Sequence, residues 1–180
     1  DLARTLGIPA THITVIKKYM GGGFGSKLQL NEHTVVAALL ARETKKPVKI
    51  MLSRQDNSLC VGNRPSTIQT YKGGVKKDGT ITALSLLSYT SGGVRGGDRS
   101  SEPMIDVHKC DNVNVEDYNI YMNTGPARPT RAPGLVQGTF GFEGFVDELA
   151  DAIGMDPLEF RKKNYTTKNR GDTGIPYSSK

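Results

Sequence analysis

The sequence predicts an α+β fold, a mixed β-sheet with packed helices, and two patterns support this prediction. Residues 66–76 and 80–89 have the alternating polarity of strands and flank Asp78-Gly79, a pair typical of a tight hairpin turn. Near the C-terminus, apolar residues recur with the spacing of one helical face. That face consists of Phe142, Phe145, Val146, Leu149, Ala150 and Ile153. We expect the strands to pack against this helix, at about 137–153.

The N-terminal part is expected to begin with a short helix and to contain two strands. Residues 2–6 favour a helix that is stopped by Gly7 and Pro9. Residues 12–19 and 48–52 are rich in β-branched and other apolar side chains, which are typical of strands. The second of these strands should be buried.

A longer helix is predicted between these two strands. Ser26 and Gln29 have the spacing of a capping box, which indicates that the helix begins there and covers residues 27–45, ending before Pro47. Because residues 35–40 are apolar on all sides of this helix, we expect it to be buried. It is therefore the second helix that should pack against the sheet.

The second half of the chain alternates between extended, irregular and helical stretches. Residues 112–123 favour a further strand, whereas residues 91–101 and the proline-rich residues 125–134 favour loops. A last helix should begin at Asp156-Pro157, with Asp at the N-cap and Pro at the first helical position. Residues 166–180 are polar and are expected to form a loose tail.

The composition is that of a globular protein and excludes several classes. Hydrophobic residues make up 36% and charged residues 23%, and no apolar run is long enough to cross a membrane. The net charge of +6 comes from scattered basic residues, without the stripe or the aromatic motif that nucleic-acid binding needs. We therefore expect neither a nucleic-acid nor a membrane partner. Cys60 and Cys110 have no metal-binding spacing, and this cysteine usage favours the cytoplasm.

Four glycines fall within the five residues 21–25, Gly-Gly-Gly-Phe-Gly, between the predicted strand and helix. Glycine lets the backbone approach a ligand closely, and a following helix N-terminus favours an anionic or hydrogen-bond-accepting group. A tight turn without a ligand is equally consistent with this pattern. The loop departs from a P-loop at Ser26 and Leu28, from the dinucleotide-binding motif at Ser26, and from a kinase loop at Met20.

Three segments together resemble one family, the molybdenum hydroxylases, which include xanthine dehydrogenase and aldehyde oxidase. Residues 20–27 are similar to the Gly-Gly-Gly-Phe-Gly-x-Lys loop of that family. Residues 130–134 resemble the Phe-Arg-x-x-Gly loop that follows it. Residues 142–164 resemble the family's helix and its closing Asp-Pro-x-Glu-x-Arg-x-x-Asn. The order and spacing of these motifs match over nearly the whole chain.

The resemblance implies a cofactor, a molybdenum–pyranopterin (molybdopterin), which has a cytosine dinucleotide form in many bacterial members. The backbone of Phe24 and Gly25 would face an oxo ligand of the molybdenum, and Arg131 would lie beside the metal centre. No residue of this chain would ligate the metal directly. A core position for Phe24 and a carbonyl-binding role for Arg131 are the alternatives. The residues expected to bind the cofactor are Gly23, Phe24, Gly25, Arg131 and Ala132.

The resemblance also implies that residues 1–165 are part of the first molybdopterin-binding domain of a large subunit. The reaction would be hydroxylation of an aldehyde or an N-heterocycle with oxygen from water. Electrons would leave through iron–sulfur clusters and FAD on other domains or subunits. The family's catalytic Glu lies beyond the matched region, so no residue here is expected to be catalytic. The chain, which lacks an initiator Met, is expected to be an internal fragment that is inactive alone.

Three positions bear on the small-molecule substrate. Purine enzymes of the family carry a Glu where Leu28 stands and a Phe where Pro133 stands, and Arg99 falls near the place of their substrate arginine. These departures favour an aldehyde-oxidase-like member over a xanthine enzyme. Two other functions stay open. One is a module that binds an anion or a nucleotide with the glycine loop alone, and the other is a divergent structural subunit without the cofactor.

Overall fold

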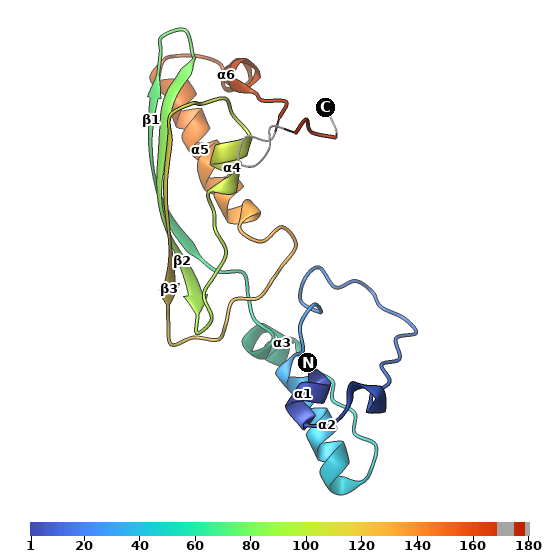
Figure 1. The fold of residues 1–180 in the computed structure, drawn as a ribbon. Helices are drawn as coiled ribbons and strands as arrows, with labels where there is room; N and C mark the ends of the chain where they lie inside the picture. The colour runs from blue at the N-terminus through green and yellow to red at the C-terminus, as the bar shows by residue number, and fades with distance from the viewer. Residues whose placement is uncertain (169–174, 179–180) are drawn as a thin grey trace. The chain divides into compact units, whose positions relative to one another are not determined.

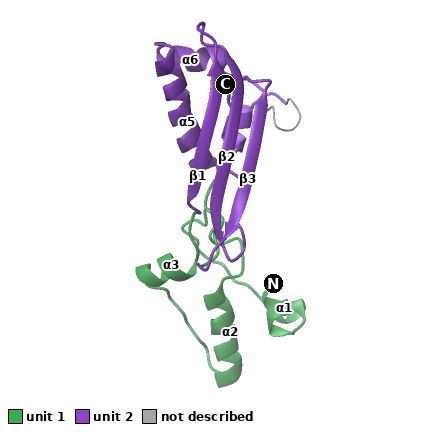
Figure 2. Ribbon diagram, turned by 90° about the vertical axis from the view of Figure 1, so that its left-hand side faces the viewer, with its two compact units in different colours: residues 1–64, 125–131 green, residues 65–124, 132–180 purple. Residues whose placement is uncertain are grey.

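The chain forms two compact units (Figure 2) in a computed structural model that describes residues 1–168 and 175–178. Unit 1 contains Asp1–Arg64 and Gly125–Arg131, and unit 2 contains Pro65–Thr124 and Ala132–Lys180. Unit 1 is therefore built from two separate stretches of chain. The helices occur in both units and the sheet in unit 2, so the predicted α+β class is confirmed.

Unit 1 is helical. It contains the helices α1 (Leu2–Leu6), α2 (Glu32–Thr44) and α3 (Arg54–Cys60), and the 3-10 helix η1 (Ala10–His12) (Figure 1). As predicted, α1 ends at Gly7, which has a left-handed φ of 67°. α3 follows Ser53, whose hydroxyl accepts a hydrogen bond from the amide of Asp56 in a capping box. The sequence pattern around α3 did not lead us to expect this helix.

The two strands predicted in this part of the chain are not found. Residues 12–19 and 48–52 form no strand, and Val15, Ile16 and Met51 are exposed. A strand becomes stable when a neighbouring strand pairs with its backbone, and the described residues of unit 1 include no such neighbour. Both strand predictions are therefore wrong, because the β-branched pattern has no pairing partner in the described part of the chain.

Helix α2 begins later than predicted and is not buried. Its N-cap is Asn31, so the chain from Ser26 to Asn31 separates the glycine loop from the helix. The Ser26 hydroxyl donates to the Gly23 carbonyl at 2.9 Å instead of capping a helix. No residue of α2 is buried, and its neighbour in unit 1 is the short helix α1. The helix that covers the sheet is α5 (Leu135–Ala152), in unit 2, so the predicted burial of residues 35–40 is wrong.

Unit 2 contains a three-stranded sheet. As predicted, the first two strands form an antiparallel hairpin around Asp78-Gly79, where Gly79 has a positive φ of 86°. The third strand pairs parallel to the second after a crossover through α4 (Glu102–Asp106), so the sheet is mixed. The second strand continues beyond its predicted end, into the first residues of the predicted loop at 91–101. In sheet order the strands are β1 (Thr67–Val75), β2 (Ile81–Gly93) and β3 (Val113–Tyr121).

Helices α4 and α5 (Leu135–Ala152) cover one face of the sheet (Figure 1). Because side chains alternate along a strand, Leu84 and Leu86 of β2 both point to this face, and both are buried. On α5, Phe142 and Val146 are buried at the expected helical spacing. The Phe142 ring centre lies 6.0 Å from that of Tyr71 on β1. Sheet and helix thus share one core, and α5 begins slightly before its predicted start.

Helix α6 (Pro157–Asn164) begins as predicted, with the Asp156 carboxylate accepting hydrogen bonds at its N-cap. Its last residue, Asn164, is buried. The Asn164 side-chain amide donates to the Gly79 carbonyl at 2.8 Å, and its oxygen accepts from the Ile81 amide at 3.1 Å. This side chain and the ion pair between Lys163 and Asp78, at 3.3 Å, therefore hold α6 to the turn between β1 and β2.

A charged network joins α5 to α6 and to the buried His108. The Glu143 carboxylate accepts a hydrogen bond from Arg161 Nε at 2.7 Å and lies 3.4 Å from His108 Nε2. Arg161 also pairs with Asp147. The hydrogen bond with His108 lowers the pKa of the Glu143 carboxyl below its ordinary value of 4.5, Arg161 adds to this lowering, and burial opposes it.

Glu143→Gln is expected to lower the free energy of unfolding at neutral pH, and to lower it less in acid. A carboxyl whose pKa is depressed by folding stabilises the folded chain above about pH 4.5 and loses that contribution as the pH falls through its folded-state pKa. Urea unfolding of wild type and variant between about pH 3 and pH 7 measures the difference. Glu148→Gln, exposed on the same helix and outside the network, is the control. A difference that does not change with pH would contradict this expectation.

The predicted loose tail, residues 166–180, is described only in part. The Thr166 amide donates to the Val107 carbonyl at 3.3 Å, and the Tyr177 hydroxyl donates to the Asp106 carbonyl at 2.7 Å. Residues 169–174 and 179–180 lie outside the described residues, so the prediction is untested there. Within residues 1–168 and 175–178, no helix combines the length and apolarity needed to cross a bilayer.

Candidate functional site

The glycine loop has a backbone that most residues cannot adopt. Gly22 and Gly25 have φ values of 119° and 99°, and between them Phe24 has a φ of 48°. A non-glycine residue with positive φ is uncommon and costs conformational energy, which the surrounding contacts must offset. The Phe24 side chain is exposed, so the alternative that it is a core aromatic does not hold within this chain.

Hydrogen bonds fold the loop on itself and leave three of its amides available. The Ser26 amide and hydroxyl both donate to the Gly23 carbonyl, and the Lys27 ammonium donates to the Gly22 carbonyl at 2.6 Å. The amides of residues 23–25 donate to no acceptor in the described part of the chain. Three successive N–H groups without a protein partner suit an anionic or strongly accepting group, because an unsatisfied donor is costly once water is excluded.

The two loops that the sequence singled out meet within unit 1. The Arg131 amide donates to the Phe24 carbonyl at 2.7 Å. Gly25 lies directly against Pro129: a Cβ at Gly25 would overlap the Pro129 carbonyl oxygen and lie 2.7 Å from its carbonyl carbon. The absence of a side chain at Gly25 is therefore required by the second loop itself. We had expected glycine at this position because a ligand approaches the backbone, but the contact with Pro129 already requires it.

The guanidinium of Arg131 is exposed and bonds to no group among residues 1–168 and 175–178. The alternative role of binding backbone carbonyls belongs instead to Arg64. Its Nη2 donates to the carbonyls of Thr130 and Arg131, at 3.0 and 2.7 Å. Arg64 thus stabilises the loop from one side and leaves the Arg131 charge available for a ligand.

Arg128 is a residue of this loop that the sequence patterns missed. It is only 6% exposed, and its guanidinium donates to Gln29 Oε1 at 2.6 Å and to Glu32 Oε1 at 2.8 Å. Gln29, which we expected in a capping box, is therefore a partner of Arg128. The acceptors lie 99 and 96 residues earlier in the chain, so no local pattern could have revealed them.

The remaining site predictions fall in different units. Leu28 is exposed in unit 1, whereas Arg99, Ala132 and Pro133 belong to unit 2. Within unit 2, a Cβ at Gly134 would overlap the Arg99 carbonyl oxygen, so the loop that carries Arg99 lies against the end of the 130–134 loop. Ala132 has a positive φ of 58°.

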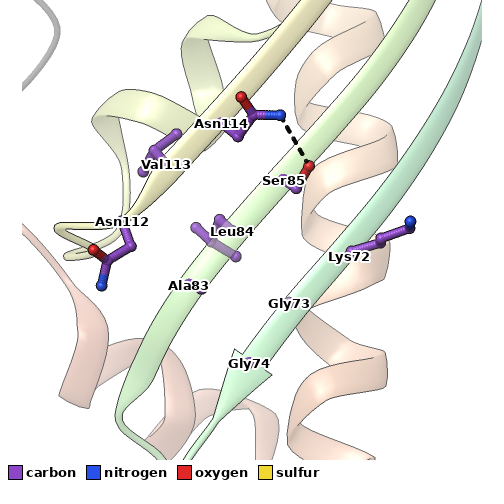
Figure 3. Close-up of a pocket in the computed structure, with 9 residues that line it drawn as sticks. All are labelled: Lys72, Gly73, Gly74, Ala83, Leu84, Ser85, Asn112, Val113 and Asn114. Carbon is purple, nitrogen blue, oxygen red and sulfur yellow. Dashed lines mark hydrogen bonds between the residues drawn. The ribbon is translucent and has the colours of Figure 1, made fainter.

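A hollow of about 420 Å³ lies on the sheet of unit 2 (Figure 3). Lys72, Gly74, Ser85 and Asn114 are among the residues that line it, and Asn114 Nδ2 donates to Ser85 Oγ at 3.5 Å. None of the predicted cofactor or substrate residues contributes to it. In the described part of the chain no three His, Cys, Asp or Glu side chains are grouped to hold a metal ion. The paired loops of unit 1 therefore form the candidate site.

Comparisons with known proteins identify the family of the chain. A family model described as the molybdopterin cofactor-binding domain matches residues 1–165. The chain is 36% identical over 176 residues to the aldehyde oxidoreductase molybdenum-binding subunit PaoC of Escherichia coli (strain K12). This match covers 96% of this chain and 24% of PaoC. The chain is 33% identical over 169 residues to the xanthine dehydrogenase/oxidase of Gallus gallus, covering 90% of this chain and 12% of that protein.

A solved structure shows the same fold. The quinoline 2-oxidoreductase of Pseudomonas putida 86 matches with a TM-score of 0.84 and 26% identity, over 91% of this chain and 22% of that chain. The chain thus spans about a quarter or less of the length of these relatives. The family resemblance stated from the sequence motifs is confirmed: the chain belongs to the molybdopterin cofactor-binding domain family.

Proposed function

We propose that this chain supplies part of the molybdopterin site of an oxidoreductase that hydroxylates aldehydes or N-heterocycles. The observation that carries the proposal is the hydrogen bond from the Arg131 amide to the Phe24 carbonyl. It joins two loops that are far apart in sequence and that both resemble cofactor-binding loops of the family. A plain turn without a ligand would need neither the second loop nor the free amides.

Each residue of the site has a distinct task in this proposal. The amides of Gly23, Phe24 and Gly25 donate hydrogen bonds to the cofactor, since no described residue accepts from them. The Arg131 guanidinium offers a positive charge to an anionic group of the cofactor. Ala132, the next residue, has a small side chain that leaves room for the cofactor. The bound molybdenum–pyranopterin supplies the two-electron redox chemistry. This chain orients it and contributes no catalytic acid or base.

Aldehydes are the favoured substrate class. Leu28 and Pro133 replace the Glu and Phe that the resemblance assigns to purine enzymes, and Leu28 cannot hydrogen-bond a polar substrate edge. An unsatisfied buried polar group costs about 1–3 kcal/mol. Arg99 is the third substrate-side residue in this proposal. The name of PaoC, an aldehyde oxidoreductase subunit, points the same way.

The parent protein is proposed to complete the site with parts outside this sequence. These are the remainder of the large subunit, which would bring the catalytic Glu, and the iron–sulfur clusters and FAD on other domains or subunits. The pterin is proposed in its molybdopterin or cytosine dinucleotide form. Residues 1–165 would be the part of this chain that binds it. The parent protein is proposed to lie in the cytoplasm.

The 180-residue chain is expected to bind no molybdenum and to oxidise no aldehyde when it is produced alone. Its glycine loop offers three amides and its Arg131 loop one guanidinium, whereas a cofactor of this size needs enclosure from water and many contacts. The test is to produce the chain and its full-length parent in a host that makes the cofactor. Metal analysis and turnover of an aldehyde and of hypoxanthine are then measured for both.

The parent should contain molybdenum and favour the aldehyde. A parent without molybdenum would overturn the proposal and favour a divergent structural subunit. Nucleotide binding by the isolated chain would favour an anion-binding module instead. Stoichiometric molybdenum with turnover in the chain alone would show that the site is complete within it.

A further inference from the structure

The guanidinium of Arg128 connects two segments of unit 1 that are remote in sequence. Its Nη1 donates to Gln29 Oε1 at 2.6 Å and its Nη2 donates to Glu32 Oε1 at 2.8 Å. Gln29 follows the glycine loop, and Glu32 is the first residue of α2. Both acceptors therefore lie on the chain that leads out of the glycine loop, while Arg128 lies on the loop that contains Arg131.

The surroundings of Arg128 are shaped to accept this side chain. The Arg128 side chain is buried, and its Nε has no hydrogen-bond partner among the described residues. A Cβ at Gly62 would overlap Arg128 Cγ, so Gly62, with a φ of 102°, leaves the space that the side chain fills. The Arg128 amide donates to the Asn63 carbonyl at 3.1 Å. Backbone and side chain of Arg128 are thus both fixed.

These contacts require arginine, because two nitrogens of one rigid plane reach two different acceptors. A lysine ammonium carries the same charge but is a single point on a flexible chain. Glu32 is 59% exposed, so its charge is screened by water and the geometry matters more than the ion pair by itself. The burial of Arg128 nevertheless makes loss of either acceptor costly, since a buried charged donor would be left unpaired.

We infer that Arg128 is a positioning residue that sets the placement of the Arg131 loop against the glycine loop. Arg128 lies next to Pro129, whose carbonyl packs on Gly25, and the Arg131 amide that follows bonds to Phe24. Holding Arg128 to Gln29 and Glu32 keeps these two contacts in place. The consequence for the cofactor rests on the proposed function, but the effect on loop placement does not.

The first test is hydrogen exchange of the Arg131 amide in the full-length protein, prepared without cofactor. Arg128→Lys is expected to speed this exchange about tenfold or more, because the loop opens more often when the two side-chain bonds are lost. Glu32→Gln, which keeps an acceptor oxygen, should give a smaller rise in the same direction. If Arg128→Lys fails to fold, Glu32→Gln still decides the question. Unchanged exchange in the variant that folds would overturn the inference.

The second test uses the parent loaded with cofactor. Arg128→Lys should lose part of its molybdenum and shift the Mo(V) electron paramagnetic resonance signal, whereas a residue needed only for folding would change the amount of protein and not the signal. The control is Arg4→Lys, an exposed arginine of unit 1 that pairs with Asp1 at 2.7 Å. It should change neither readout.

The outcomes separate the two proposals. A wild-type parent without molybdenum refutes the proposed function, while the exchange experiment still tests the loop placement. Faster exchange with an unchanged molybdenum content and an unchanged signal would overturn the role of Arg128 at the cofactor. The inference is supported when both the exchange rate and the signal respond to Arg128→Lys and neither responds to Arg4→Lys.

Discussion

Gly25→Val in the full-length parent is expected to reduce turnover about 100-fold or more. The new Cβ would overlap the carbonyl oxygen of Pro129, and a β-branched residue opposes the φ of 99° that Gly25 adopts. The glycine loop and the Arg131 loop must then move apart, and this movement breaks the hydrogen bond between the Arg131 amide and the Phe24 carbonyl. Molybdenum content, turnover and thermal melting of wild type and variant measure the effect.

The melting temperature of Gly25→Val should differ little from that of the wild type, because the glycine loop contributes no residue to the buried core of unit 2. Gly21→Ala is the matched control in the same loop. A Cβ at Gly21 meets no atom within 4 Å, and its φ is not in the left-handed region. This variant should keep its activity. Normal turnover in Gly25→Val would mean that the contact between the loops is not needed for function.

Phe142→Ala is expected to destabilise unit 2 by about 3–5 kcal/mol, which is the usual cost of emptying a buried aromatic site. Phe142 is 0% exposed and packs against Tyr71 and against His108, whose ring centre is 5.5 Å away. Its removal would leave a cavity between α5 and the sheet. Urea unfolding of the 180-residue chain, followed by circular dichroism, measures the loss.

Phe140→Ala is the corresponding control, since it lies on the same helix and is 87% exposed. It should change the free energy of unfolding by less than about 0.5 kcal/mol. If both variants lost the same amount of unfolding free energy, the result would contradict the burial of Phe142 in the core and the face of α5 that packs on the sheet.

The sequence predicted the three strands, α5 and α6 of unit 2 because each of them carries a local signal, whereas α4 was not predicted. The β1–β2 hairpin needs only the turn at Asp78-Gly79, and α5 carries its own apolar face. The cap at Asp156 is likewise local. By contrast, residues 12–19 and 48–52 have strand-like composition but no pairing partner in unit 1, and no residue of α2 is buried against the described residues. Composition predicts what a segment can form, and partners decide whether it does.

For the candidate site, too, local motifs were predicted and contacts between distant residues were missed. The two loops were identified from short motifs, but their meeting through Phe24 and Arg131 could not be derived from spacing alone. Arg128 and Arg64 were missed because their acceptors are distant in sequence. Gln29 was misassigned for the same reason: its pattern fits a capping box, and its side chain instead meets the guanidinium of Arg128.

The divided composition of unit 1 has a consequence for biosynthesis. Its first stretch, Asp1–Arg64, leaves the ribosome before its second stretch, Gly125–Arg131, has been translated. At about 5–20 residues per second, the glycine loop waits several seconds for the segment that packs against it. During that interval the β1–β2 hairpin is already available to form. Nascent chains stalled before Gly125 should therefore leave the glycine loop without its packing segment and open to proteases.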